Sequence, residues 1–212
     1  RGIDGWKDAG LEVSTQARVP EPVLYQAASD STQLHKLIDG DFVYKRLGDP
    51  LYQIIDVRSK AEYIGEKGTK GLRGELLKLG HIPTAVNINY ENNWTDAESK
   101  SFKSYAGLQE LYRGLDSAKG VIVYCNSGRR SAFSYFVLRL MGFENVFTYE
   151  PSWKEWGLPE KYYPVETLEN RLTGKALPEP GQRTLSVQKV QKSSGQKPLS
   201  GKPSGGYVSC GG

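Results

Sequence analysis

The sequence predicts an α/β protein in which helices cover both faces of a central parallel sheet. Short apolar runs alternate with segments of helical periodicity through the middle of the chain, which is typical of this fold class. The run Val121-Ile122-Val123-Tyr124 is apolar without interruption and mostly β-branched, as expected of a central strand buried on both faces. No apolar stretch approaches the roughly 18 residues needed to cross a bilayer, so we expect no membrane span.

Four runs predict strands of this sheet. They share a high content of branched aliphatic and aromatic residues. The predicted strands are residues 52–57, 85–88, 121–124 and 145–148.

Three helices are predicted in the same region. The first begins at Ser31 as N-cap and runs through Leu34, Leu37 and Ile38. The second covers residues 105–114, and the third covers residues 129–141 and ends before a glycine at position 142. The residues expected to face the core are Leu108, Leu111 and Tyr112 in the second helix and Phe133, Phe136, Val137 and Leu140 in the third.

Composition divides the chain into four segments. Residues 1–13 predict a helical piece, residues 14–30 a linker, and residues 31–170 the α/β domain. Residues 171–212 form a basic, low-complexity tail with too few large apolar residues to offset the entropy of ordering, so we expect it to be disordered.

A short internal repeat relates the start of the chain to the end of the domain. The pattern of residues 5–11 matches that of residues 152–158, where the second copy closes the α/β domain. We therefore expect the first copy to end a preceding unit, so that the chain is the last part of a tandem protein. The start at Arg1, without Met, looks internal or processed, and the compartment stays open between the cytoplasm and the bacterial periplasm.

The formal net charge of +4 belongs to the tail, because residues 175–212 carry six basic residues and one acidic residue. A short, dilute basic tail is typical of a solvated end, so no nucleic-acid partner is expected. His35 and His81 stand alone and predict no metal site. Two cysteines, Cys125 and Cys210, are too few for a disulfide scaffold in a chain of this length.

Cys125 is the strongest candidate for chemistry, because it directly follows the predicted central strand. The loop Asn126-Ser127-Gly128-Arg129-Arg130-Ser131 then leads into the third helix. Ligands of open α/β sheets bind at this edge. The helix N-terminus and the two arginines favour the thiolate and should lower the pKa of Cys125, while Gly128 lets successive amides point inward. The alternative, a buried structural cysteine, does not explain so polar a loop.

A thiolate in such a loop could attack phosphorus or sulfur. Phosphatases of the tyrosine class place five residues between the cysteine and an arginine, but here Ser131 occupies that position. The loop is also one residue shorter than the phosphate-binding loop of that family. The spacing therefore favours a single sulfur atom as the target.

The loop of Cys125 resembles the active-site loop of the rhodanese family, Cys-x-Ser-Gly-x-Arg-Ser. Three further motifs resemble family motifs and occur in the family order. With the loop, they extend the resemblance over about residues 31–165. The motifs are Asp56-Val57-Arg58 with Glu62-Tyr63, Gly80-His81-Ile82-Pro83 before the strand at 85–88, and Ser152-Trp153-Lys154-Glu155-Trp156-Gly157. The resemblance implies a three-layer α/β/α fold with about five parallel strands. It points to the C-terminal domain of a tandem thiosulfate or 3-mercaptopyruvate sulfurtransferase.

What the resemblance implies is a sulfurtransferase without a cofactor. Cys125 would take sulfane sulfur from thiosulfate or a related anion as a persulfide, and would pass it to cyanide or a thiol in a second half-reaction. The loop at 126–131 would bind donor and persulfide. Asp56, Arg58 and Glu62 would support the loop, although for Asp56 and Arg58 a purely structural ion pair is an equal alternative.

Two departures from the family pattern leave the donor open. Ser127 stands where two-domain thiosulfate enzymes carry a lysine, and Glu62 stands where they carry an arginine. Lys67, Lys70 and Arg73 could replace the lost positive charge or could belong to a solvated loop.

A second hypothesis is a binding module that carries persulfide sulfur to one partner protein without turnover. Cys210, in the tail, could receive that sulfur because thiols attack sulfane sulfur, or could take no part. The acceptor and the oligomeric state are left open by the sequence.

Overall fold

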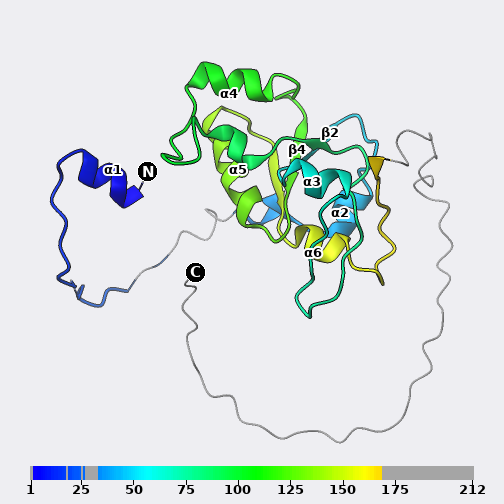
Figure 1. Cartoon of the computed structure of the whole chain (residues 1–212), viewed down its shortest axis with the longest axis horizontal. Coiled ribbons are helices and arrows are strands. Elements are labelled where there is room, and N and C mark those ends of the chain that lie inside the picture. The colour runs from blue at the N-terminus through cyan, green and yellow to red at the C-terminus, as the bar shows by residue number, and fades with distance from the viewer. Residues whose placement is uncertain (1, 18, 25, 27–32, 169–212) are drawn as a thin grey trace, which may run out of the picture.

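The computed structural model describes residues 2–17, 19–24, 26 and 33–168, and its folded part is a three-layer α/β/α domain (Figure 1). The elements are α1 (Gly2–Asp8), η1 (Leu34–Lys36), β1 (Leu37–Ile38), α2 (Gly40–Tyr44), β2 (Tyr52–Asp56), α3 (Lys60–Ile64), β3 (Val86–Asn87), η2 (Tyr90–Asn93), α4 (Tyr105–Tyr112), β4 (Gly120–Tyr124), α5 (Arg129–Leu140), β5 (Val146–Tyr149) and α6 (Ser152–Trp156).

The sheet has five parallel strands in the order β1-β5-β4-β2-β3, which confirms the predicted fold class. The strand β4 is central, and all five of its residues are buried. Its register with β2 runs from Tyr52 opposite Gly120 to Asp56 opposite Tyr124. The carboxyl ends of β2 and β4 therefore lie side by side, which is the edge at which ligands of such sheets bind.

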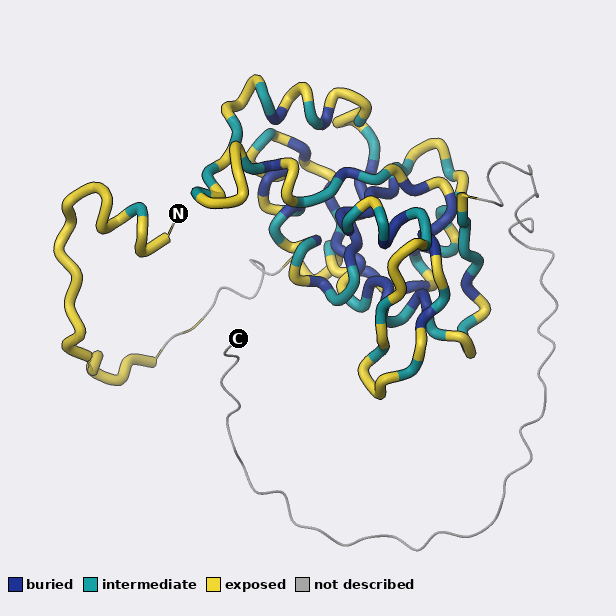
Figure 2. The backbone as a smooth tube through the Cα atoms, in the orientation of Figure 1, coloured by how far each residue is buried: buried dark blue, intermediate teal, exposed yellow. Residues whose placement is uncertain are grey.

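Alternate residues of the central strands fill two separate cores. Ile54 and Ile122 face a cluster that includes side chains of α2, α3 and α6. Ile55 and Val123 face a second cluster built with α4 and α5. Figure 2 shows the buried residues concentrated along the sheet between these layers. Because both faces are covered, the central strands are apolar at every position rather than alternating.

The prediction of a helix through Leu34, Leu37 and Ile38 is wrong. Leu34 belongs to η1, whereas Leu37 and Ile38 form the edge strand β1 and pair with Thr148 and Tyr149 of β5. Apolar residues this close together are compatible with a helix or a strand. Residues 37 and 38 form a strand because they pair with the edge of β5. The proposed N-cap at position 31 lies outside the described residues.

The helix α5 has nearly the predicted bounds but a different buried face. Its buried residues are Ser131, Ser134, Val137 and Leu138. Phe136 and Leu140, expected in the core, are 54% and 63% exposed. The helix carries apolar residues on several sides, so its periodicity alone does not determine which face is buried. The small side chains of Ser131 and Ser134 allow the start of the helix to lie close to the strand ends.

The predicted helical piece at the N-terminus is α1, and none of its residues is buried. The tandem arrangement and the four-segment division therefore stay predictions. Residues 169–212, which include the whole basic tail and Cys210, lie outside the described part. Among the described residues, no helix combines the length and apolarity that a membrane crossing requires.

Because α5 buries a different face from the one predicted, two of its leucines should differ strongly in their contribution to stability. Leu138→Ala should lower the free energy of unfolding by about 2–5 kcal/mol, because Leu138 is fully buried and its truncation leaves a cavity. Leu140→Ala should change it by less than about 0.5 kcal/mol. Urea denaturation of both variants checks this, and a larger loss for Leu140→Ala would contradict the described packing.

Candidate active site

Cys125 lies at the carboxyl end of β4, where it forms part of the lining of an open pocket of about 440 Å³. The other lining residues are Tyr90, Trp94, Asn126, Ser127, Arg129, Arg130 and Phe133. Cys125 is only 1% exposed, so the residue contributes little surface to the pocket that it lines. Of the predicted loop, Gly128 and Ser131 do not line the pocket.

The sulfur of Cys125 accepts hydrogen bonds from its own loop. The backbone N–H of Ser127 donates to Sγ at 3.4 Å, and the hydroxyl of Ser131 lies 3.7 Å from it. Burial raises the pKa of the Cys125 thiol, but hydrogen bonds from Ser127 and Ser131 and the positive charge of Arg130 outweigh burial, so the pKa is lowered from its ordinary value of 9.0. Arg129, expected to contribute, is not among these causes.

Gly128 turns the chain from the loop into α5. Its φ of +86° lies in the left-handed region, and a Cβ at this position would lie 3.2 Å from the carbonyl oxygen of Glu150. The positive φ favours glycine at this position, and the close approach to Glu150 adds to that preference. The Ser131 hydroxyl shares its one proton between the Gly128 carbonyl at 2.8 Å and Cys125 Sγ at 3.7 Å, which links the turn to the sulfur.

The start of α6 holds the other side of the loop. The Cys125 N–H donates to Ser152 Oγ at 3.1 Å, and the Cys125 carbonyl accepts from the Trp153 N–H at 3.1 Å. The Asn126 carbonyl accepts from the Lys154 N–H at 3.0 Å. Ser152 is fully buried with a φ of +55°. These residues belong to the closing sequence motif, but sequence reasoning did not assign them to the site.

Arg130 and Glu62 form a bidentate ion pair, with both nitrogen–oxygen distances at 2.8 Å. Burial raises the pKa of Glu62, but Arg130 and Ser59 outweigh it and lower the pKa from 4.5 to about 2. Glu62 also closes a capping box with Ser59 at the start of α3. The charge of Arg130 is thus largely compensated. Arg129 is exposed and has no hydrogen bond or ion pair among the described residues.

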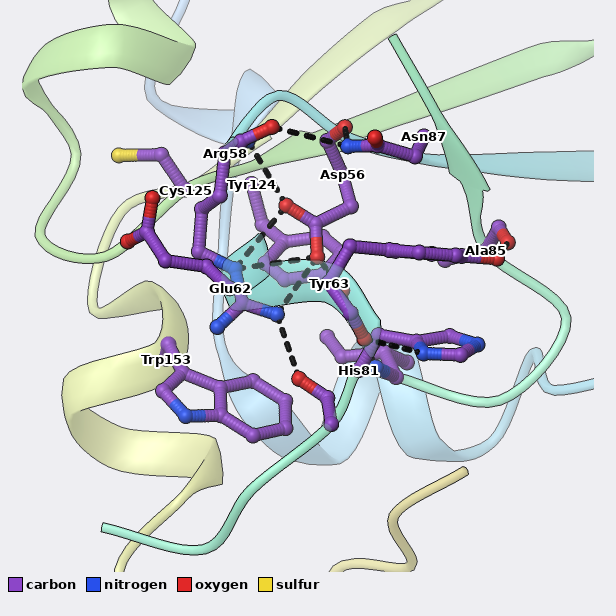
Figure 3. Close-up of polar contacts among 12 residues, drawn as sticks. Asp56, Arg58, Glu62, Tyr63, His81, Ala85, Asn87, Tyr124, Cys125 and Trp153 are labelled. Carbon is purple, nitrogen blue, oxygen red and sulfur yellow. Dashed lines mark hydrogen bonds and ion pairs between the residues drawn. The ribbon is translucent and has the colours of Figure 1, made fainter. Parts of the chain in front are cut away.

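Asp56 and Arg58 form a buried ion pair below the loop (Figure 3). Arg58 Nη2 lies 2.6 Å from Asp56 Oδ2 and 2.7 Å from the Gly80 carbonyl, and its guanidinium lies 4.2 Å from the centre of the Trp153 ring. Tyr124 donates to Asp56 at 2.6 Å.

In Figure 3 the sulfur of Cys125 points away from this pair. Within the described part of the chain, neither Asp56 nor Arg58 bonds the loop at 125–131. Their support is indirect, through Tyr124 immediately before the loop and Trp153, whose amide holds it.

The other basic residues considered from the sequence do not reach Cys125. Lys67, Lys70 and Arg73 are absent from the pocket lining, and Arg73 lies 3.7 Å from Glu160 on the surface. His81 also lies outside the lining; its Nδ1 hydrogen-bonds a backbone carbonyl at 2.8 Å. The positive charge at the pocket therefore comes from the loop arginines alone among the described residues.

Three aromatic residues, Tyr90, Trp94 and Phe133, line the same pocket and form an aromatic wall that was missed from the sequence. Tyr90 and Trp94 follow a predicted strand without any periodic signal, and Phe133 was assigned to the core. The three rings meet edge to face, with centroids 5.3 Å apart for Tyr90–Trp94 and 6.2 Å apart for each ring with Phe133.

The model of the rhodanese-like domain matches residues 39–158, which contain the whole pocket. A thiosulfate sulfurtransferase of Corynebacterium glutamicum is 40% identical over 122 residues, covering 55% of this chain and 39% of that protein. A provisionally named thiosulfate sulfurtransferase of Mycobacterium leprae is 34% identical over 163 residues, covering 74% of this chain and 56% of that protein. The chain thus spans only part of the length of both relatives.

Among solved structures, a persulfide-bearing variant of EanB with ergothioneine is similar to this chain. The TM-score is 0.65 at 25% sequence identity, and the match covers 78% of this chain and 40% of that one.

The hydrogen bond from Ser131 predicts a measurable effect on the thiol. Ser131→Ala should raise the pKa of Cys125 and slow its alkylation by iodoacetamide at neutral pH by roughly two- to fivefold, because one donor to the thiolate is lost. The rate is measured against pH. Ser134→Ala, on the same helix, is the matched control and should leave the profile unchanged. An unaltered profile for Ser131→Ala would show that this hydroxyl does not stabilise the thiolate.

The Glu62–Arg130 pair predicts a pH-dependent contribution to stability. The folded-state pKa of Glu62 is depressed, so its contribution is present above pH 4.5 and is lost as the pH falls toward about 2. Glu62→Gln should therefore cost on the order of 2 kcal/mol at neutral pH and progressively less below pH 4.5.

Urea denaturation at a series of pH values measures the difference from the wild type. The exposed Glu98→Gln provides the control. A difference that stays constant from pH 7 to pH 3 would contradict the role of the ionised pair.

Proposed function

This chain belongs to the rhodanese family, and on that premise we propose that it is a sulfurtransferase that moves sulfane sulfur from thiosulfate, or a related anion, through a persulfide on Cys125. The single observation that carries the proposal is the placement of the Cys125 sulfur. Cys125 lines an open pocket, and its thiol accepts hydrogen bonds from Ser127 and Ser131 and has a lowered pKa. A lowered pKa increases the fraction of thiolate, which is the nucleophilic form.

In the first half-reaction the Cys125 thiolate attacks the outer sulfur of thiosulfate. A sulfur–sulfur bond forms to Cys125 while the bond between the two donor sulfurs breaks, and the electron pair leaves with sulfite. The negative charge of the persulfide would lie among the loop amides and the Ser131 hydroxyl, which already point to the thiolate. No cofactor is needed, because the reaction is a displacement at sulfur.

In the second half-reaction an acceptor nucleophile attacks the outer sulfur of the persulfide. Cyanide would leave as thiocyanate, and a thiolate would leave as a new persulfide; both return Cys125 as a thiolate. The two half-reactions share one pocket, so ping-pong kinetics follow. A cysteine persulfide in the similar EanB structure supports the intermediate, and the names of the curated relatives support thiosulfate as donor.

The proposal predicts a covalent mass change at one residue. Thiosulfate should add the mass of one sulfur atom to the protein, and cyanide should remove it with release of thiocyanate. Cys125→Ser should abolish both, because no nucleophile remains, whereas Cys210→Ser should retain both. Intact-protein mass spectrometry and a thiocyanate assay measure them, with 3-mercaptopyruvate as a second donor.

Three results would separate the alternatives. A persulfide that forms but is not discharged by cyanide or small thiols would indicate a carrier module rather than an enzyme. Absence of added mass with every donor would refute sulfur transfer. Added mass on Cys125→Ser would place the reaction at another residue.

A further inference from the structure

We propose that Thr69, which lies outside every motif considered above, is a positioning residue for sulfur transfer. Its hydroxyl fixes the side-chain amide of Asn126, and that amide donates a hydrogen bond to an oxygen of the sulfite that leaves in the first half-reaction. The inference rests on the proposed function. It assigns a task to residues 65–80, the long loop between α3 and β3 in Figure 1.

The contact that carries the inference joins two residues 57 positions apart in the sequence. The Thr69 hydroxyl donates to Asn126 Oδ1 at 3.3 Å. Asn126 lines the pocket at Cys125, whereas Thr69 does not. Thr69 therefore holds the side chain of Asn126 by its oxygen from outside the pocket lining.

The amide of Asn126 has a second polar atom, which this contact leaves for a ligand. Its Nδ2 takes part in no hydrogen bond within the described part of the chain. Because a side-chain amide is planar, a bond that fixes the oxygen also fixes the direction of both N–H bonds. Asn126 therefore offers the pocket a neutral hydrogen-bond donor that is oriented before a ligand binds.

The backbone of Asn126 is fixed independently of its side chain. Its carbonyl accepts from the Lys154 N–H of α6 at 3.0 Å. With the main chain held by α6 and the amide held by Thr69, little freedom is left to lose on binding. Donors held in this way stabilise developing charge without reorganising during the reaction.

Residues 65–80 hold Thr69 in place. The Leu77 N–H donates to the Thr69 carbonyl at 3.2 Å, and the Leu77 side chain is buried in the core cluster that includes side chains of α6. The Lys78 N–H donates to the carbonyl of Gly157, the C-cap of α6, at 2.7 Å. The segment is thus tied to the same helix that holds the loop after β4.

The basic residues of the segment do not share this position. Lys67, Lys70 and Arg73 are exposed and are absent from the pocket lining, and Arg73 lies 3.7 Å from Glu160. Within the described chain, Thr69 is the residue of this segment that hydrogen-bonds the pocket lining. The segment therefore contributes a neutral hydrogen bond to the site rather than the positive charge considered from the sequence.

The role of the amide follows from where the electrons go. When the Cys125 thiolate attacks the outer sulfur of thiosulfate, a new sulfur–sulfur bond forms, the donor bond breaks and its electron pair leaves on sulfite. The total charge is unchanged, and no oxidant or reductant is needed. An N–H of Asn126 at a sulfite oxygen stabilises the departing charge. Attack of cyanide on the persulfide releases no sulfite, so the amide acts in the first half-reaction only.

The test measures the two half-reactions separately in the full chain. Persulfide formation from thiosulfate is followed by rapid quenching and mass spectrometry, and discharge of the preformed persulfide by cyanide is followed as thiocyanate release. Thr69→Val should slow formation by about three- to tenfold, as expected for the loss of one hydrogen bond, and should change discharge by less than about twofold. Thr69→Ser should restore formation, because it returns the hydroxyl.

A double-mutant cycle tests whether Thr69 acts through Asn126. Asn126→Ala should slow persulfide formation more than Thr69→Val does, because the donor itself is lost. In the Asn126→Ala background, Thr69→Val should have no further effect. Asn126→Asp keeps an oxygen for Thr69 but has no N–H, so it should be at least as slow as Asn126→Ala.

The pKa of Cys125 gives a readout that a general disturbance of the loop would change. Burial, Ser127, Ser131 and Arg130 set that pKa. The pH profile of alkylation by iodoacetamide should therefore be the same in Thr69→Val as in the wild type. A shifted profile would show that the variant acts on the thiol and not on the leaving group.

Lys70→Gln, on the same segment, is the matched control and should leave both half-reactions unchanged; slower persulfide formation would give the segment an electrostatic role instead. Unfolding curves establish that each variant is folded under the assay conditions. Equal losses in both half-reactions, or additive losses from Thr69→Val and Asn126→Ala, would overturn the positioning role. A wild-type chain that forms no persulfide with any donor would refute the proposed function itself, which no result on Thr69 does.

Discussion

The backbone of Cys125 is held from two sides, and the site depends on this constraint. Its N–H bonds Ser152 Oγ and its carbonyl accepts from the Trp153 amide, so the chain cannot continue as a strand and turns into the loop. The loop amide of Ser127 then points to the sulfur rather than to solvent. Helix α6 is only five residues long, but its first residues hold the backbone of Cys125. Helix α5, which follows Cys125 in the sequence, holds the other end of the loop.

The thiolate is stabilised more by dipoles than by ions. The hydrogen bonds of Ser127 and Ser131 lower the pKa of Cys125 more than the charge of Arg130 does, and Glu62 lies 2.8 Å from that arginine. Arg130, the loop arginine of the family motif, is thus held by Glu62, whereas the side chain of Arg129 is exposed.

Local sequence predicted the parts whose contacts are close in the chain. The central strand, the bounds of α5 and the loop after Cys125 follow from apolar run length, helical periodicity and a glycine that must adopt positive φ. The buried face of α5 did not follow, because apolar residues occur on several sides and packing against the sheet chose among them. The edge strand β1 was missed for a related reason, since β5 supplied its hydrogen-bond partner.

The sequence by itself determined the fold class, the candidate cysteine and the loop that carries it, because each is encoded in a run of neighbouring residues. Only the tertiary structure decided which charges and surfaces surround that cysteine. Glu62 meets Arg130 across 68 positions of sequence, and Trp94 meets Phe133 from a separate element. Periodicity and motifs specify how one element is formed but not the distance between two elements. That distance follows from how the elements pack on the sheet, which brings the residues of the pocket together.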